Sequence, residues 1–129
     1  MTDGIITVKT EKNFDITFSR LIEAINKRRI PIFAIIDHKD NAQKVGMRLT
    51  DAKVVIFGKP EAGTKLMQEH IDIAIDLPLR LLIYGENGYT TIAYYDPAYL
   101  GNRYGISSSS TVLDAVKELL SKIVEEATS

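Results

Sequence analysis

The chain of 129 residues contains no cysteine. This absence excludes disulfide bonds, thiol catalysis and thiolate metal sites in one step. Long hydrophobic runs are also missing, because the longest extends only over residues 30–36, whereas a membrane helix needs about 20 residues. The first four residues lack the basic-then-apolar pattern of a signal peptide. We therefore expect a cytoplasmic protein that does not enter a membrane.

An excess of charge of one sign is absent as well. Sixteen Lys and Arg residues stand against seventeen Asp and Glu residues, so the formal net charge is −1. Nucleic-acid binding draws on clustered cations that displace counterions from phosphates. The one basic run, Lys27-Arg28-Arg29, falls where a helix is expected to end, and cations there complement the helix dipole. We predict that no nucleic acid binds, and nothing in the sequence indicates a cofactor.

What the chain does contain is typical of one compact domain. Apolar residues make up 45% of the chain and charged residues 26%. A chain of this length buries roughly two-thirds of the surface that its unfolded form exposes, so it needs no metal or disulfide to fold. We predict a single domain over residues 1–129.

Hydrophobic periodicity predicts alternating strands and helices. The solid apolar run at 32–36 indicates a strand covered on both sides, or on one side by a partner subunit. Asn87-Gly88 between two apolar runs predicts a β-hairpin. Strands are expected at 5–9, 32–36, 52–57, 79–84 and 89–95, and helices from 14, at 40–45, at 61–70, from 97 and at 111–126, with a loop at 107–110.

Two of the expected helices, the first and the last, are long enough to cover one face of a sheet. Because one strand pair is a hairpin, that sheet must be at least partly antiparallel. The sequence therefore predicts an α+β fold, a two-layer sandwich.

The turn Gly58–Lys65 follows an apolar strand and opens a helix. Its glycines have the spacing of a phosphate-binding P-loop, but the Lys and Thr that should follow are in swapped order, and Pro60 removes one amide. A second interpretation is a helix N-terminus with free amides that holds a small anion, aided by Thr64 and two lysines. A third is that Gly58 and Gly63 only satisfy turn geometry.

The two histidines offer further candidate sites. Asp37-His38 comes at the end of an apolar strand, where a histidine can act as an acid–base or a metal ligand. The alternative is a surface histidine beside a turn-forming aspartate. His70 lies between Glu69 and Asp72, so a site formed by His38, His70 and a carboxylate is a further hypothesis.

All six tyrosines fall between residues 84 and 104. Tyrosine buries a ring while its hydroxyl stays wet, which suits interfaces. Strand alternation places Tyr89 and Tyr95 on one face and Tyr94 on the other. Either the tyrosines, Tyr94 and Tyr95 above all, form a self-association surface, or they reflect β-propensity on a half-exposed sheet.

Several segments resemble the bacterial and archaeal "domain of unknown function 302" family. They are Val55–Met67, Asp76–Leu79, Tyr95–Leu100 and the segment around Asp37-His38. The resemblance implies a β-α-β(4)-α sandwich with a largely antiparallel sheet and short inserted helices, of the type found in TATA-binding-protein-like domains, and homodimers. It carries no catalytic residues over, because the family has no assigned activity.

Our leading hypothesis is a non-enzymatic homodimer that binds a small ligand or a protein partner. Its candidate binding residues are Asp37, His38, Lys59, Gly63, Thr64 and Lys65. One alternative is a small enzyme that uses His38 with Asp37 or a metal. The other is a purely structural interaction module with Tyr94 and Tyr95 at its interface.

Overall fold

The computed structural model describes residues 3–106 and 110–129, and within them a single antiparallel sheet carries the fold. Its strand order is β1-β5-β4-β3-β2, and every neighbouring pair is antiparallel. The strands are β1 (Ile5–Thr10), β2 (Ile32–Asp37), β3 (Ala52–Phe57), β4 (Leu79–Glu86) and β5 (Tyr89–Tyr95). The helices are α1 (Phe14–Asn26), α2 (His38–Lys44), α3 (Pro60–Glu69), the 3₁₀ helix η1 (Ile71–Asp76), α4 (Pro97–Arg103) and α5 (Thr111–Thr128).

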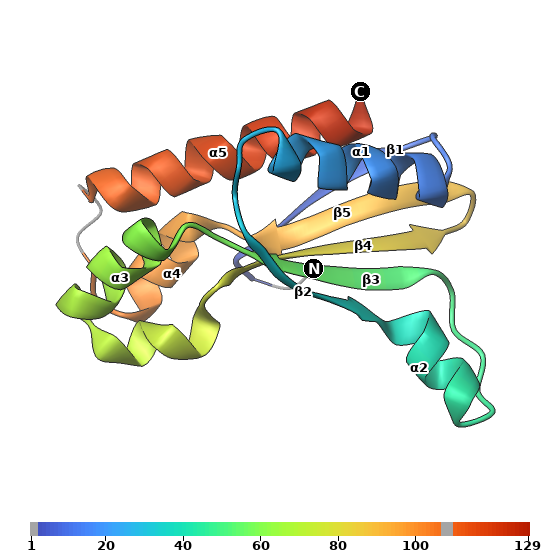
Figure 1. Ribbon diagram of the computed structural model, residues 1–129, viewed down its shortest axis with the longest axis horizontal. Coiled ribbons are helices and arrows are strands. Elements are labelled where there is room, and N and C mark those ends of the chain that lie inside the picture. Colours follow the sequence, from blue (N-terminus) through green and yellow to red (C-terminus); the bar gives the residue numbers. More distant parts are fainter. Residues whose placement is uncertain (1–2, 107–109) are drawn as a thin grey trace.

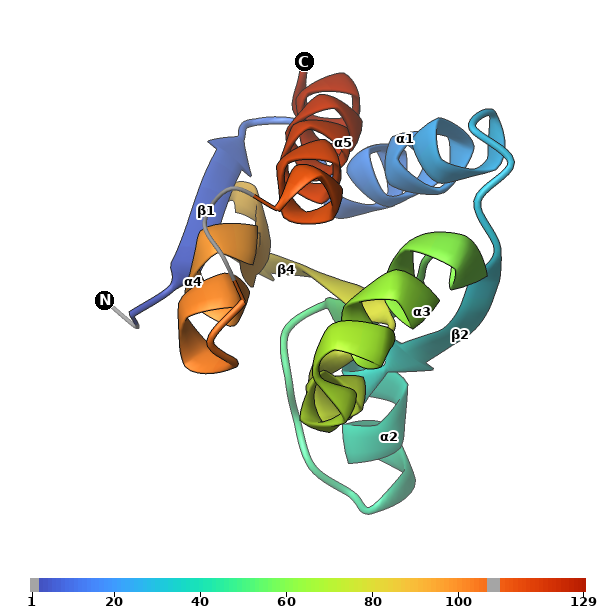
Figure 2. The ribbon, with the colours of Figure 1, turned by 90° about the vertical axis from the view of Figure 1, so that its left-hand side faces the viewer.

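Two helices form the second layer. Helices α1 and α5 lie side by side over one face of the sheet, while α3, η1 and α4 gather at one end of the strands and α2 extends from the other end (Figures 1 and 2). The predicted α+β sandwich of the β-α-β(4)-α type is confirmed, with α2, α3, η1 and α4 as its insertions.

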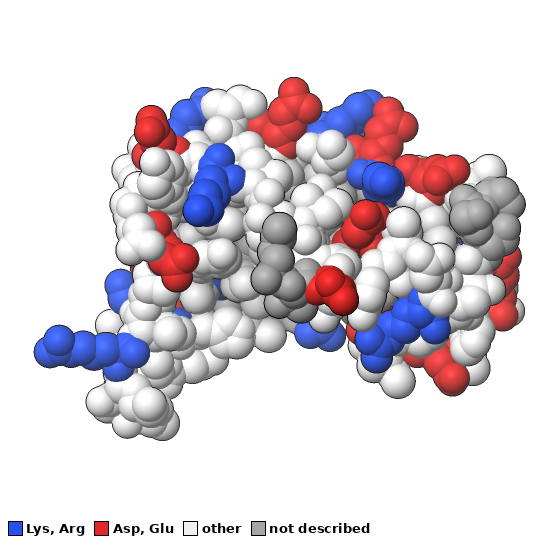
Figure 3. Space-filling view, turned by 180° about the vertical axis from the view of Figure 1, so that it is seen from behind, with Lys and Arg blue, Asp and Glu red and all other residues white. Residues whose placement is uncertain are grey.

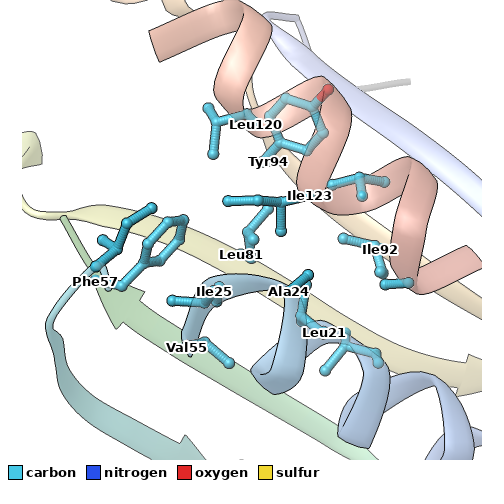
Figure 4. Close-up of a cluster of buried hydrophobic side chains, with 14 of the residues drawn as sticks. Leu21, Ala24, Ile25, Val55, Phe57, Leu81, Ile92, Tyr94, Leu120 and Ile123 are labelled. Atoms are coloured by element: carbon cyan, nitrogen blue, oxygen red, sulfur yellow. The ribbon is translucent and has the colours of Figure 1, made fainter. Parts of the chain in front are cut away.

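The hydrophobic core fills the space between these layers. Alternate residues of a strand point to opposite faces, so every second residue of β3, β4 and β5 meets the helices. These side chains come from both layers, as the close-up shows (Figure 4). The core includes Leu21, Ala24 and Ile25 of α1, Val55 and Phe57 of β3, Leu81 of β4, Ile92 and Tyr94 of β5, and Leu120 and Ile123 of α5.

Local signals in the sequence set the element boundaries as expected. The Asn13 side chain accepts a hydrogen bond from the Ile16 amide at 2.8 Å and begins α1. Asn87 and Gly88 have φ values of 53° and 80°, the left-handed pair that a two-residue hairpin turn requires. The predicted loop at 107–110 falls mostly outside the described residues, although Ser110 caps α5.

Strand β2 differs from the prediction of a strand that the chain covers on both sides. It lies at the edge of the sheet, with an irregular register between Ile32 and Ala34. Phe33 is 54% exposed and Ile35 is 46% exposed. Cover by the chain itself was therefore a wrong expectation, because an apolar run does not reveal whether its strand lies in the centre or at the edge. Cover by a partner subunit stays a prediction.

The basic run Lys27–Arg29 ties the two long helices together. Lys27 and Arg28 at the end of α1 form ion pairs with Glu126 of α5. The hydrogen bond from Lys27, together with the Arg28 charge, lowers the pKa of the Glu126 carboxyl. On the face shown in Figure 3, cationic and anionic side chains are interspersed.

This ion pair predicts how stability depends on pH. Because the folded pKa of Glu126 lies below its ordinary value of 4.5, the pair stabilises the protein above that pH and is lost as pH falls through the folded pKa. We expect Glu126→Gln to lower the urea midpoint at neutral pH and to leave it unchanged well below pH 4.5.

Glu118→Gln is the matched control, because Glu118 pairs only with Lys122 of its own helix, at 3.0 Å. An exposed pair one helical turn apart contributes little, so this variant should change the midpoint less. A deficit of Glu126→Gln that persists undiminished in acid would contradict the role given to the charge.

Candidate functional site

A mainly apolar hollow of about 350 Å³ opens beneath helix α3. We call it the α3 pocket. Its walls come from the turn after β3, from α3, from the segment between η1 and β4, and from single residues of β2 and α5. The lining residues are Phe33, Gly58, Lys59, Pro60, Ala62, Gly63, Thr64, Leu66, Met67, Ala74, Leu77, Pro78, Leu79 and Val116.

The pocket lies where two hydrophobic clusters meet. Leu79 and Val116 belong to or pack against the main core under α1 and α5. Leu66 belongs to a second, smaller cluster that also contains Ile73 and Leu113. Two clusters with separate centres leave a gap that neither fills. A hollow of this kind, apolar with a few polar groups at its rim, is the usual form of a small-molecule site.

The turn before α3 is held by its backbone. The Gly58 amide donates to the Pro31 carbonyl at 3.1 Å, which ties the end of β3 to the start of β2. Pro60 occupies the first turn of α3, where its missing N–H leaves no donor unpaired. These contacts hold the floor of the pocket and leave the side chains of Lys59 and Thr64 exposed on its lining.

The N-terminus of α3 has fewer free backbone amides than the anion-binding hypothesis requires. The amides of Ala62 and Gly63 both donate to the Lys59 carbonyl, at 3.1 and 3.2 Å, and Pro60 has none. Two amides of the first turn of α3 therefore already have a backbone acceptor. An anion here would depend on the Lys59 ammonium more than on the backbone. The P-loop interpretation also fails. It would need residues 71–76 as an apolar strand that ends in a magnesium-binding acid, Asp76, but these residues form the 3₁₀ helix η1.

The structure divides the predicted binding residues into separate groups. Lys59, Gly63 and Thr64 line the α3 pocket, whereas Lys65 lines a different hollow beside Ser110 and Val112.

Asp37 and His38 lie at the far end of β2. Asp37 pairs across the sheet with Lys53 near the start of β3, while Lys59 follows the end of that strand. Their expected grouping with the turn is therefore wrong, because β2 and β3 run antiparallel. The Asp37 carboxylate accepts a hydrogen bond from the Asp40 amide at 2.9 Å and caps α2. His38 is exposed and does not line the α3 pocket.

The histidines are not brought together either. His38 begins α2 and His70 follows α3, and these helices lie at opposite ends of the sheet (Figure 1). His70 instead packs its ring edge-on against Tyr104, with 5.7 Å between ring centres. Among residues 3–106 and 110–129, no three His, Asp or Glu side chains are placed to hold a metal ion.

A polar cluster that the sequence did not reveal joins η1 to α4. The Tyr104 hydroxyl donates to the Asp76 carboxylate, and this hydrogen bond raises the pKa of Tyr104. Arg103 lies 3.7 Å from the same carboxylate. Tyr104 and Asp76 are 28 positions apart in the sequence, so no local pattern could have paired them. The polar groups of this cluster therefore bond to one another, and these bonds position α4.

The tyrosines separate as strand alternation predicts. Tyr94 points into the core, is 7% exposed, and has its pKa raised by burial. Tyr95 is 41% exposed on the opposite face and stacks on Tyr99, with 6.0 Å between ring centres. Tyr94 thus lies beneath the surface, and an interface role stays a prediction for Tyr95.

The face that carries Tyr95 is mainly apolar, with Lys9 and Arg80 as its charged members, and has no long helix over it within the described residues. We call it the open sheet face. Its apolar members alternate with the core residues of each strand, and most of them are partly or largely exposed, although Ala93 is only 7% exposed. The exposed ones include Ile5, Ala34, Ile36, Val54, Ile56, Leu82, Tyr84 and Tyr95.

Fold and pocket together define a class: a two-layer β-α-β(4)-α domain with an apolar pocket at one end of its sheet. A solved structure described as an uncharacterized conserved protein DUF302 from Bacillus stearothermophilus shares this fold. Its TM-score is 0.86 at 18% identity, and the match covers 98% of this chain and 99% of that one. The sequence matches the family model "Domain of unknown function DUF302" over residues 6–127. The chain belongs to the DUF302 family, as its motifs suggested.

Curated relatives share the sequence over part of their length. The protein described as fluoride-specific ion channel FluC 1 of Brucella suis biovar 1 is 31% identical over 118 residues, which are 91% of this chain and 46% of that protein. FluC 2 of Brucella melitensis biotype 1 is also 31% identical, over 43% of its length. The chain thus spans less than half of these relatives. Within its described residues, no helix is long and apolar enough to cross a membrane.

Two helical glycines give opposite predictions for stability. A Cβ at Gly63 in α3 would meet the Met67 Cε at 3.6 Å and the Leu77 Cδ1 at 3.9 Å, which are ordinary contacts. We expect Gly63→Ala to raise the free energy of unfolding by about 0.5–1 kcal/mol, because alanine loses less backbone entropy in a helix.

Gly101 of α4 is the matched control. A Cβ there would lie 2.9 Å from the Leu113 Cδ1, so Gly101→Ala must displace a buried side chain. We expect no gain, or a loss, in urea unfolding of this variant. An equal gain at both positions would show that helix propensity alone decides and that Leu113 yields freely.

Proposed function

We propose that the chain is a binding module that holds a small, mainly apolar molecule in the α3 pocket. The observation that carries the proposal is a hollow of about 350 Å³ in which only Lys59 and Thr64, of fourteen lining residues, have polar side chains. Ligand pockets usually measure about 300–1,000 Å³ and pair apolar walls with a few polar groups. The residues that form the pocket fall largely within the segments that resemble the family.

The enzyme hypothesis has less support in the geometry. A general base needs to lie within hydrogen-bond reach of a substrate in a cleft. Asp37 already accepts the hydrogen bond that caps α2, and His38 next to it is exposed. The channel activity named for the relatives is not part of the proposal, since the chain spans less than half of their length.

Filling the pocket tests the proposal. Gly63→Leu would extend a side chain from α3 toward Met67 and Leu77 and occupy the hollow. We expect apolar fragments found by native mass spectrometry and thermal shift on the wild-type protein to lose at least about tenfold in affinity, because displaced apolar contacts cost about 0.8 kcal/mol per methylene.

Ala115→Leu is the control, because it also introduces a leucine side chain, at an exposed position of α5 that does not line the pocket. It should bind fragments as the wild type does. Fragments that bind Gly63→Leu undiminished would place the binding site elsewhere and overturn the proposal.

A second candidate, self-association, rests on the open sheet face. Strands about 4.8 Å apart and about 20 Å long make the whole five-stranded face roughly 500 Å². Its exposed apolar part is smaller, because Lys9 and Arg80 also lie there, and it is within the range of patches that monomers leave exposed. A second copy offers the same surface about a two-fold axis, which buries it on both sides. We infer that the module is a homodimer paired through this face.

One substitution can charge the open sheet face without breaking the sheet. Ile56 lies opposite Arg80 in the register of β3 and β4, so Ile56→Glu creates a cross-strand pair of opposite charges. We expect this variant to be a folded monomer in multi-angle light scattering where the wild type is a dimer.

Ile16→Glu is its control, because Ile16 is a 50% exposed residue of α1 on the helical side, where glutamate suits the first turn. This variant should remain dimeric. A wild type that stays monomeric at concentrations of about 1 mM would contradict the dimer and leave the pocket proposal intact.

A further inference from the structure

The α3 pocket has walls that select an apolar tail. Leu66, Met67 and Leu77 line its interior. Phe33 of the edge strand β2 also lines it and is 54% exposed. At about 30 Å³ for each water-sized unit, a volume of about 350 Å³ holds about a dozen non-hydrogen atoms. A ligand that fills the pocket is therefore the size of a chain of about eight to ten carbons with a small head group.

The charge on the pocket has one sign. Lys59 is the only ionisable residue among those that line it, and no carboxylate shares the lining. Across the described part of the chain, Lys59 takes part in no ion pair. Its neighbour Glu61 is exposed and does not line the pocket. An anionic head is attracted here, whereas a cationic head would meet an uncompensated ammonium.

The position of Lys59 places this charge at the pocket edge. It precedes the first residue of α3, and the positive end of the helix dipole points the same way. Thr64, one turn along from Pro60, adds a hydroxyl donor to the same lining. The ammonium and the hydroxyl can each donate to one oxygen of a carboxylate, while the tail lies against Leu66 and Met67.

We infer that the ligand of the α3 pocket is a medium-chain monocarboxylate, with its carboxylate at Lys59 and its alkyl chain inside. This inference rests on the ligand-binding function proposed above and adds the chemical class. The attraction is electrostatic and lies at an exposed rim, so it should weaken with added salt. The contribution of the alkyl tail should not weaken with added salt.

The experiment compares three probes with the same eight-carbon chain: octanoate, 1-octanol and octylamine. Binding is followed by amide shifts of Gly58, Gly63 and Thr64 in ¹⁵N-labelled protein, which locate the ligand as well as measure it. We expect octanoate to bind about fivefold more tightly than 1-octanol, in the range that an exposed ion pair supplies, and octylamine to bind most weakly.

Two lysine variants separate charge from packing. Lys59→Met keeps the straight apolar stem and removes the ammonium. It should reduce the octanoate affinity to about that of 1-octanol and change the 1-octanol affinity much less. Lys65→Met is the matched control, because Lys65 lies in α3, which Lys59 immediately precedes, but lines the other hollow. This variant should change the affinity for neither octanoate nor 1-octanol.

The outcomes distinguish a failure of the carboxylate assignment from a failure of the ligand-binding function on which it rests. If octanoate and 1-octanol shift the pocket amides with equal affinity, and Lys59→Met changes neither, the pocket binds apolar ligands and the carboxylate class is overturned. If none of the three probes shifts these amides up to its solubility limit, both the class and the ligand-binding function fail. Tighter binding of octylamine would reverse the sign assigned to the rim.

Discussion

The structure depends on covering one face of the antiparallel sheet with two long helices. Leu21 and Ile25 of α1 and Leu120 and Ile123 of α5 have almost no exposure, and they meet every second side chain of the strands. Because this packing uses one face only and α1 and α5 cover it, the other connections, which carry α2, α3, η1 and α4, project from the ends of the sheet (Figure 1). The open sheet face and the peripheral position of α3 and α2 both follow from that asymmetry.

The α3 pocket is a consequence of the same arrangement. Helix α3 is too far from the main core to bury its apolar side chains there, so Leu66 packs with Ile73 and Leu113 in a cluster of its own. Rigid backbone elements join the two clusters, and interiors pack closely only where side chains can interdigitate. The junction is left hollow, and Val116 and Leu66 line it from the two sides.

Local signals in the sequence predicted the elements well, and long-range order limited the rest. Caps such as Asn13 and the Asn87-Gly88 turn act within a few residues, so the order of elements and the fold class could be predicted. The exposure of Phe33 depends on β2 being at the edge, and the separation of Asp37 from Lys59 depends on antiparallel pairing with β3. Neither feature can be predicted from a short stretch of the sequence. For the same reason the turn at Gly63 could be proposed as a site, but its apolar walls could not.

The polar residues of the family motifs show why Lys59 matters. Asp37 and Asp96 cap helices, and the Asp76 carboxylate accepts a hydrogen bond from Tyr104. Each of these carboxylates stabilises the fold. For the two capping aspartates, loss of the hydrogen bond would cost about 1 kcal/mol. Lys59 and Lys65 stand in the same motifs and take part in no ion pair in the described chain, and of the two only Lys59 lines the α3 pocket. A charge that the fold does not use, on the lining of an apolar hollow, is available to recognise something outside the chain.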